Sequence, residues 1–186
     1  MLNMINKIPG RHSFAPRFFK KEGLLFLLLL TLLFLIIAFP FFPHLIIIDG
    51  KHKKLLFKSS LADSDEFVIS FIHSTNLTPV DDYFKIEKDY TITLMESHFE
   101  SYSVGMPSEL NEGEVLELKN GKIIIKNMNR NLPYIDLRIG QLVANHTLII
   151  NNKTIPFKII ASPGSMVKIK AEKLSLLQMW GVFNRE

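Results

Sequence analysis

The hydrophobic pattern divides the chain into one long apolar run and a remainder of short segments. The run from Leu24 to Pro43 contains a single polar side chain, Thr31, among residues that are mostly Leu, Phe and Ile. A helix needs ~20 apolar residues to cross the ~30 Å hydrocarbon core of a membrane. The pattern therefore predicts a transmembrane helix within residues 23–45, and we expect Pro40 and Pro43 to end it because proline lacks a backbone donor.

Beyond the run, apolar residues recur in short segments that are rich in β-branched and aromatic side chains and are separated by turn residues. Many short strands with few helices predict an all-β fold, here a single small β-sandwich or barrel-like domain. One short C-terminal helix is expected after residue 172. The predicted strands are residues 45–49, 54–59, 66–73, 83–87, 91–102, 115–119, 122–126, 134–139, 147–150, 153–159 and 166–171.

Two pairs of these segments have the pattern of β-hairpins. Asn120-Gly121 lies between the first pair, and this dipeptide suits the positive φ angles of a type I′ turn. Asn151-Asn152 lies between the second pair and gives a similar but weaker signal.

The net charge of +4 resides in the N-terminal tail. Up to His44 there are five basic residues and one acid, whereas the chain from Leu45 onward has 17 of each sign. Basic residues before an apolar run favour a cytoplasmic N-terminus. We therefore expect residues 1–22 to form a basic cytoplasmic tail and residues 46–186 an extracytoplasmic domain at the cell membrane.

The same segment could in principle be a cleaved signal peptide. Its apolar run is longer than the usual 7–15 residues, and no small-x-small cleavage site follows it. A single-pass signal anchor is therefore the expectation. The neutral domain behind it lacks the basic excess of a nucleic-acid-binding domain, so nucleic acid is not an expected partner.

Candidate chemistry is sparse. The chain has no cysteine, which excludes disulfides, thiolate zinc sites and thiol catalysis. His73 and Ser74 invite a hydrolase interpretation, but neighbouring strand residues point to opposite faces, and no nucleophile-elbow glycines surround Ser74. No catalytic residue is assigned, and the alternative is a strand-to-loop junction in which His73, Ser74 and Thr78 bond to loop backbone.

A metal site would have to combine His73, Asp82, Glu96 and His98. Glu96 and His98 are two residues apart, so they share one face of a strand and could converge on one ion. Nothing in the sequence brings His73 to them. No metal or cofactor is assigned.

Two loops resemble the family of the domain of unknown function 1850. Its hallmarks are a strand ending in His-Ser followed by a Thr-Pro-Val turn, and an acidic strand running into a Ser/Gly/Pro loop. The corresponding stretches are FIHSTNLTPVDDYF and ESHFESYSVGMPS, and a looser third element combines an Arg-Ile strand with a later His. The matching residues are His73, Ser74, Thr78, Pro79, Val80, Glu96, Phe99, Ser101, Gly105, Pro107, Arg138 and His146.

Three positions depart from the family pattern. Asn76 replaces a frequent acid, Ser103 stands at a usual glycine, and Asp82 is the shorter stand-in for a frequent glutamate. We expect Asp82 to belong to the site with the matching residues. The altered length of its side chain puts in doubt any role that needs the reach of a glutamate.

The resemblance implies a function. Family members have no established enzymatic activity and are commonly encoded beside TAXI-type tripartite ATP-independent periplasmic (TRAP) transporters. It implies a membrane-anchored accessory protein whose loops 73–84 and 101–108 contact the permease or the solute-binding subunit. Two alternatives stay open, namely an extracytoplasmic metal-binding or hydrolytic module centred on His73, and a β-sandwich scaffold or adhesion module.

Overall fold

The computed structural model describes residues 21–102 and 109–180 of the 186-residue chain. The chain divides into two compact units, residues 1–38 and residues 39–186. Two residues of the second family motif, Gly105 and Pro107, lie outside the described residues.

The first unit contains one helix, α1 (Lys21–Ala38), and none of its side chains is buried. It is the one helix among the described residues that is long and apolar enough to cross a membrane. Its 18 residues span about 27 Å at 1.5 Å per residue. The helix ends before Pro40 because that ring removes a backbone donor and restricts the preceding residue.

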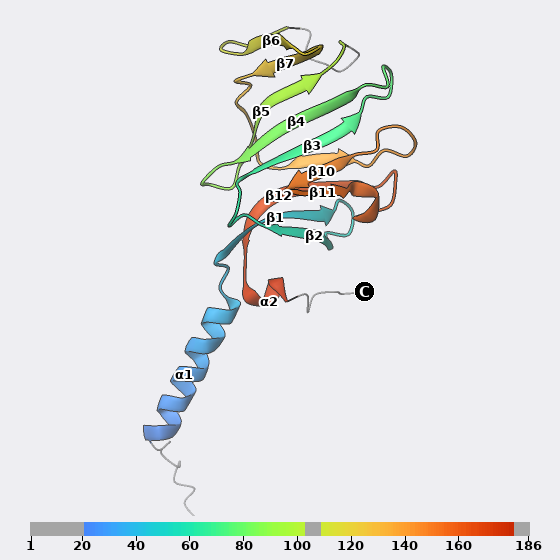
Figure 1. The fold of residues 1–186 in the computed structure, drawn as a ribbon. Helices are drawn as coiled ribbons and strands as arrows, with labels where there is room; N and C mark the ends of the chain where they lie inside the picture. The colour runs from blue at the N-terminus through green and yellow to red at the C-terminus, as the bar shows by residue number, and fades with distance from the viewer. Residues whose placement is uncertain (1–20, 103–108, 181–186) are drawn as a thin grey trace, which may run out of the picture. The chain divides into compact units, whose positions relative to one another are not determined.

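The second unit is built from strands (Figure 1). The strands are β1 (Phe42–Asp49), β2 (Leu55–Ser60), β3 (Glu66–Ile72), β4 (Pro79–Ile86), β5 (Ile92–Phe99), β6 (Val115–Lys119), β7 (Lys122–Lys126), β8 (Arg130–Leu132), β9 (Ile135–Arg138), β10 (Thr147–Ile150), β11 (Lys153–Pro156) and β12 (Met166–Leu174). A 3₁₀ helix, η1 (Phe157–Ile159), and a short helix, α2 (Leu176–Met179), complete the elements.

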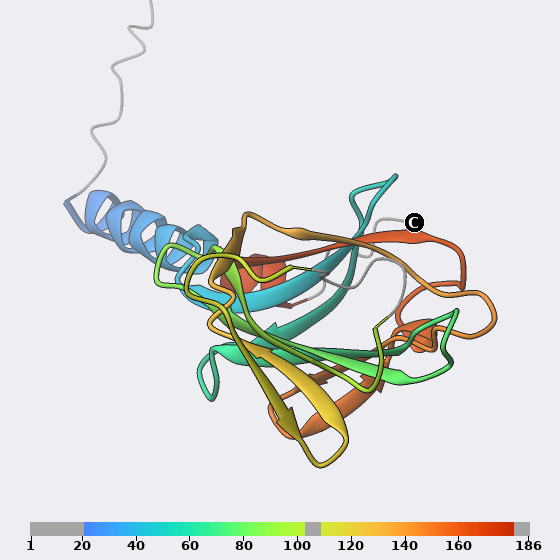
Figure 2. The ribbon, with the colours of Figure 1, turned by 90° about the horizontal axis from the view of Figure 1, so that it is seen from above.

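The strands form two antiparallel sheets, so the predicted all-β class is confirmed. One sheet has the order β2-β1-β12-β9, and the other has the order β11-β10-β3-β4-β5-β7-β6, with β8 paired to β5. The two sheets lie as two layers (Figure 2) around a core drawn from both. Leu45, Ile47 and Ile169 of the first sheet meet Phe67 and Leu148 of the second in that core.

Two boundaries differ from the prediction. Residues 42–45 were included in the membrane segment but begin β1, where backbone pairing with β12 and burial of Leu45 hold them in the sheet. Residues 79–82 were expected in a loop but begin β4, because their polar side chains have partners on both faces of the sheet. The three-residue strand β8 is too short for its pattern to be visible in the sequence.

The two predicted hairpins are present. Asn120 (φ +53°) and Gly121 (φ +75°) connect β6 to β7, in the positive-φ conformation of a type I′ turn. Asn151 and Asn152, also at positive φ, connect β10 to β11. The expected C-terminal helix, α2, begins with a capping box in which Ser175 and Gln178 bond each other's backbone N–H groups.

Candidate functional site

The three family motifs meet at one end of the eight-stranded sheet. Because the strands are antiparallel, β3 ends at Ile72 where β4 and β10 begin, at Pro79 and Thr147, and β5 ends there at Phe99. The loops that carry the motifs therefore leave the sheet side by side. We call this region, formed by residues 73–78, 99–102 and 140–146, the motif end.

The loop from His73 to Thr78 closes on its own backbone. The N–H of His73 donates to the carbonyl of Thr78 (2.9 Å), and the N–H of Leu77 donates to the carbonyl of His73 (2.9 Å). The ring Nδ1 of His73 accepts from the N–H of Thr75 at 3.3 Å. Leu77 has a φ of +56°, a conformation that bulky residues rarely adopt. His73 thus shapes this loop, and Ser74 is exposed on it.

Asn76 joins the first motif to the second. Its Nδ2 donates to Oγ of Ser101 (2.7 Å) and to the carbonyl of Tyr102 (3.0 Å). Phe99 is fully buried below this contact, and its ring packs edge-on against Tyr102 at 5.4 Å. The residue that departs from the family pattern therefore makes the connection between the two loops. The sequence marked Asn76 as unusual but offered no signal that Ser101 would be its partner.

His146 attaches the third motif to the same end. Its Nδ1 accepts from the N–H of Gly140 (3.1 Å), and its ring lies 5.4 Å from that of Phe71. The N–H of Ile72 donates to the carbonyl of Ala144 (2.8 Å). Burial lowers the pKa of His146, so the ring is neutral at physiological pH and holds its segment as a structural acceptor.

Arg138 is the one motif residue of the four-stranded sheet. It is the last residue of β9 and lies opposite Met166 of β12. Its side chain is exposed and forms no ion pair with any residue that the structure describes. The structure therefore separates Arg138 from the contacts that join the other motif residues.

The adjacent carboxylates Asp81 and Asp82 point to opposite faces of β4. Asp82 shares the inner face with Val80, and its Oδ1 accepts from Oγ of the buried Ser97 at 2.7 Å. Burial raises the pKa of Asp82, although the bond from Ser97 opposes this. Asp81 lies on the outer face, where it accepts from Oγ of Ser70 at 2.7 Å. Alternation along the strand separates the pair.

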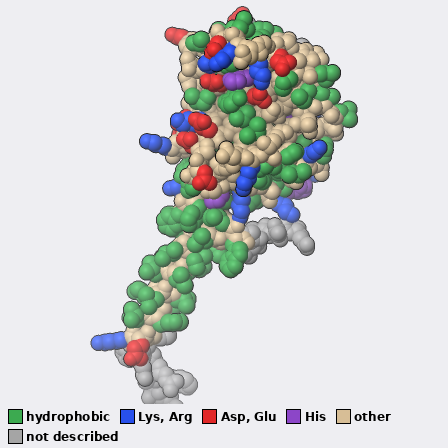
Figure 3. All heavy atoms as spheres, in the orientation of Figure 1, with side chains coloured by type: hydrophobic (Ala, Val, Ile, Leu, Met, Phe, Trp, Pro, Cys, Tyr) green, Lys and Arg blue, Asp and Glu red, His purple; other side chains and the backbone are tan. Residues whose placement is uncertain are grey.

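Charged side chains collect on part of the domain surface (Figure 3), and three ion pairs lie on the outer face of this sheet: His98 with Glu96, Lys122 with Asp81, and Lys126 with Glu117. Nε2 of His98 lies 2.9 Å from Oε2 of Glu96, and the centroid of the His98 ring lies 4.4 Å from that of Tyr83, with the two ring planes tilted by 39°. The prediction that Glu96 and His98 share a face is therefore confirmed. The same alternation puts Asp82 on the inner face, so the four residues weighed for a metal site do not converge. Within the described ranges no group of three or more His, Asp or Glu could hold a metal ion.

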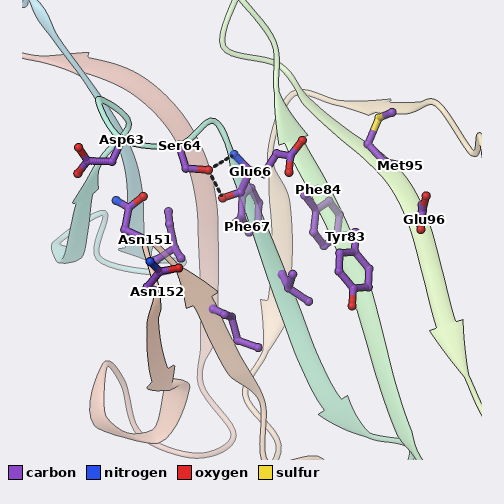
Figure 4. Close-up of a pocket in the computed structure, with 13 residues that line it drawn as sticks. Asp63, Ser64, Glu66, Phe67, Tyr83, Phe84, Met95, Glu96, Asn151 and Asn152 are labelled. Carbon is purple, nitrogen blue, oxygen red and sulfur yellow. Dashed lines mark hydrogen bonds between the residues drawn. The ribbon is translucent and has the colours of Figure 1, made fainter.

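A hollow of about 700 Å³ opens on the outer face at the end opposite the motif loops (Figure 4). Tyr83 and Glu96 line it together with the Asn151-Asn152 turn, and Ser64 bonds the backbone of Glu66 at its rim. Glu96 is the only family-motif residue among the lining residues. The hollow is therefore separate from the motif end.

Comparison with known proteins identifies one family. Residues 67–157 match the family model of the Domain of unknown function (DUF1850). No curated protein and no solved structure matches the chain. The matched range begins within β3 and ends at Phe157, so it includes all three motifs that meet at the motif end. Residues 67–157 therefore form a domain of the DUF1850 family.

Proposed function

We propose that the chain is a membrane-anchored, extracytoplasmic accessory protein of a TAXI-type TRAP solute transporter. In this proposal the motif end contacts the permease or the solute-binding subunit. The association of the family with such transporters supports the partner. The observation that carries the proposal is that the family motifs build an exposed surface with apolar side chains at its tips.

Four large apolar side chains at or beside the motif end are exposed to solvent. Surface apolar residues that gather in one region are typical of protein-contact sites. The exposed fractions are 96% for Leu142, 71% for Ile159, 64% for Leu77 and 51% for Tyr102.

Backbone contacts fix these side chains in one region. Leu77 lies in the first motif loop, and the carbonyl of Tyr102 accepts from Asn76 of the same loop. Leu142 belongs to the segment 140–146 that His146 and Ala144 tie to the end of β3. Ile159 ends η1, whose first N–H, that of Phe157, donates to the carbonyl of His146. The four exposed apolar side chains therefore come from separate parts of the chain.

The path of β1 sets the distance, within the domain, between the first strand residue and the motif end. The chain enters the domain at Phe42, and β1 runs from there to Asp49. Gly50 then bonds Met166, and Ser165 bonds Ile139 beside the motif end. Eight strand residues extend roughly 25 Å. The motif end therefore lies about one strand length from the point at which the anchor segment joins the domain.

Co-purification tests this proposal. The full chain, isolated from its own cells in mild detergent, should recover subunits of a TRAP transporter. The double variant Leu77→Asp/Leu142→Asp should lose that recovery, because it places two charges at the contact surface. Both positions are exposed, so the domain should fold normally.

The matched control is Val115→Asp, which changes a side chain that is 51% exposed at the opposite end of β6 from the motif loops. It should retain the partner. If wild-type protein recovers no transporter subunit and deletion of the gene leaves solute uptake unchanged, the proposal fails.

The orientation of the anchor belongs to the same proposal. The basic tail supports a cytoplasmic N-terminus, and α1 supports a single membrane crossing. A phosphatase fused after Glu186 should therefore be active, and protease added to spheroplasts should digest the domain. Protection of the domain until the cells are lysed would contradict this orientation and would remove an extracytoplasmic partner from consideration.

A further inference from the structure

Strand β6 forms one border of the eight-stranded sheet. It pairs with β7 on one side, and no described strand pairs with its other side (Figure 1). Its side chains are unusually apolar for a border strand, with Leu118 74% exposed, Val115 51% and Leu116 37%. An apolar border strand is a template for pairing with a further strand.

The backbone of β6 is directed for such pairing. Lys119 and Lys122 flank the two-residue turn, so they form a hydrogen-bonded pair, and bonded and non-bonded pairs alternate from there. Lys119, Glu117 and Val115 therefore direct their backbone groups to β7. The N–H and C=O groups of Leu116 and Leu118 point away from β7, toward the open border.

Side chains on this strand are sorted by face. Leu116 and Leu118 lie opposite Ile125 and Ile123, so they extend the apolar inner face of the sheet to its border. Glu117 lies on the outer face, where it pairs with Lys126 at 2.5 Å. A partner strand must therefore offer an apolar side chain opposite Leu118 and charges that complement the outer face.

The sequence of β6 meets this requirement itself. We infer that β6 pairs antiparallel with β6 of a second copy of this chain, about a twofold axis at Leu118. In that register Leu118 lies opposite Leu118 of the other copy, and Glu117 lies opposite Lys119 twice by symmetry. A register centred on Glu117 would place like charges opposite each other, which is destabilising. The charges therefore favour the register centred on Leu118 over the register centred on Glu117.

The register sets one short distance between the copies. The backbone groups of Leu118 point outward, so the two Leu118 residues form a hydrogen-bonded pair with Cα atoms about 5.5 Å apart. That separation suits a disulfide. Val115, by contrast, lies three residues from the axis, so its two copies are roughly 20 Å apart along the strands.

Single-cysteine crosslinking tests the pairing, since the native chain has no cysteine. Leu118→Cys in the full chain, oxidised in native membranes, should give a disulfide-linked dimer on a non-reducing gel. Val115→Cys on the same strand and Leu142→Cys at the motif end control for random collision at exposed positions. We expect about tenfold more dimer from Leu118→Cys than from either control.

Charge reversal tests the register in the Leu118→Cys background. Glu117→Lys should lower the dimer yield about tenfold, because it sets lysines against lysines. Adding Lys119→Glu should restore the yield by exchanging the two charges. Dimer no greater than in the controls overturns the inference, as does a yield that the double exchange does not restore. Disulfide formation with a different protein at Leu118→Cys also overturns it.

Discussion

The two halves of the eight-stranded sheet are held in different ways. Strands β11, β10, β3 and β4 share a core with the four-stranded sheet, in which residues from both layers are buried. Strands β5, β7 and β6 extend to the other border. Ile92 of β5 still belongs to the shared core, whereas Phe99 of β5 and Ile125 of β7 form a smaller cluster with Val80 and Met128. No residue of the four-stranded sheet belongs to that smaller cluster.

Polar contacts add stability around the smaller cluster, which buries fewer apolar side chains than the large one. Glu114, whose side chain is 1% exposed, accepts from Arg130 at 2.7 Å and from Asn111 at 2.8 Å. On the inner face, Asp82 and Ser97 lie between Ile69 of the large cluster and Ile125 of the small one. We infer that burial of apolar area stabilises the covered half, whereas the other half depends more on individual hydrogen bonds and ion pairs.

Truncation in each core gives the largest expected effect. Ile47→Ala removes a fully buried side chain between the two sheets and should lower the free energy of unfolding by about 3–4 kcal/mol. The same change at the fully buried Ile125 should cost about 2 kcal/mol, because its neighbours come from one sheet and can relax. Urea unfolding followed by circular dichroism compares them. Equal losses would remove the distinction between the halves.

The next largest effect is expected at the ion pair between Arg130 and Glu114. Arg130→Met leaves the Glu114 carboxylate buried without its cation and should cost about 2 kcal/mol. The double variant with Glu114→Gln should recover most of that loss. Burial opposes ionisation, but the bonds from Asn111 and Arg130 outweigh it and lower the pKa of Glu114.

The lowered pKa of Glu114 determines how the stability lost in Arg130→Met depends on pH. The pKa of Glu114 is lower in the folded state than in the unfolded state. The stability that its carboxylate contributes is therefore fully present above the unfolded pKa and is lost as the pH falls through the folded pKa. The deficit of Arg130→Met should therefore shrink in acid. A deficit that is unchanged by pH would contradict an ionic role for Arg130.

Asp82→Asn should have a smaller effect of opposite sign. Burial raises the folded pKa of Asp82, so its contribution is full when the carboxyl is protonated below the unfolded pKa and is lost as pH rises through the folded pKa. Asn can still accept from Ser97 and carries no charge. The variant should be more stable than wild type by on the order of 1 kcal/mol at neutral pH. Unfolding at pH 7 and pH 3 should show the gain only at the higher value.

Leu142→Asp should have the smallest effect on stability. The side chain is 96% exposed, so the free energy of unfolding should change by less than about 0.5 kcal/mol. The same variant should weaken the proposed partner contact. A large loss of stability would mean that Leu142 supports the fold, and the motif end would lose its interpretation as a docking surface.

Much of the fold could be predicted because its causes are local. The alternation of apolar residues and the Asn120-Gly121 turn act within a few residues, and both predicted hairpins formed. The predictions were wrong at positions whose structure depends on residues that are distant in the sequence. Pairing with β12 draws residues 42–45 into the sheet, and Ser70 and Ser97 make polar strand positions of Asp81 and Asp82.

The candidate site was predicted in its parts but not in its assembly. The family motifs predicted most of the site residues, and strand alternation predicted that Glu96 and His98 lie on the same face of the sheet. The contact of Asn76 with Ser101 spans 25 residues of chain and depends on how the strands are paired, so no local pattern contains it. The sequence could not place the exposed side chains of Leu142 and Ile159 at this site, because backbone contacts between distant segments bring them to the end of β3.

The most direct test of the account is site-specific photo-crosslinking in living cells. A photoreactive amino acid at position 142, in the full chain, should crosslink to a TRAP transporter subunit, whereas the same probe at the exposed position 115 should not. Mass spectrometry of the crosslinked band identifies the partner. The account predicts a permease or solute-binding subunit at position 142. The absence of any such crosslink, or equal crosslinking from both positions, would contradict the claim that the motif end is the contact surface.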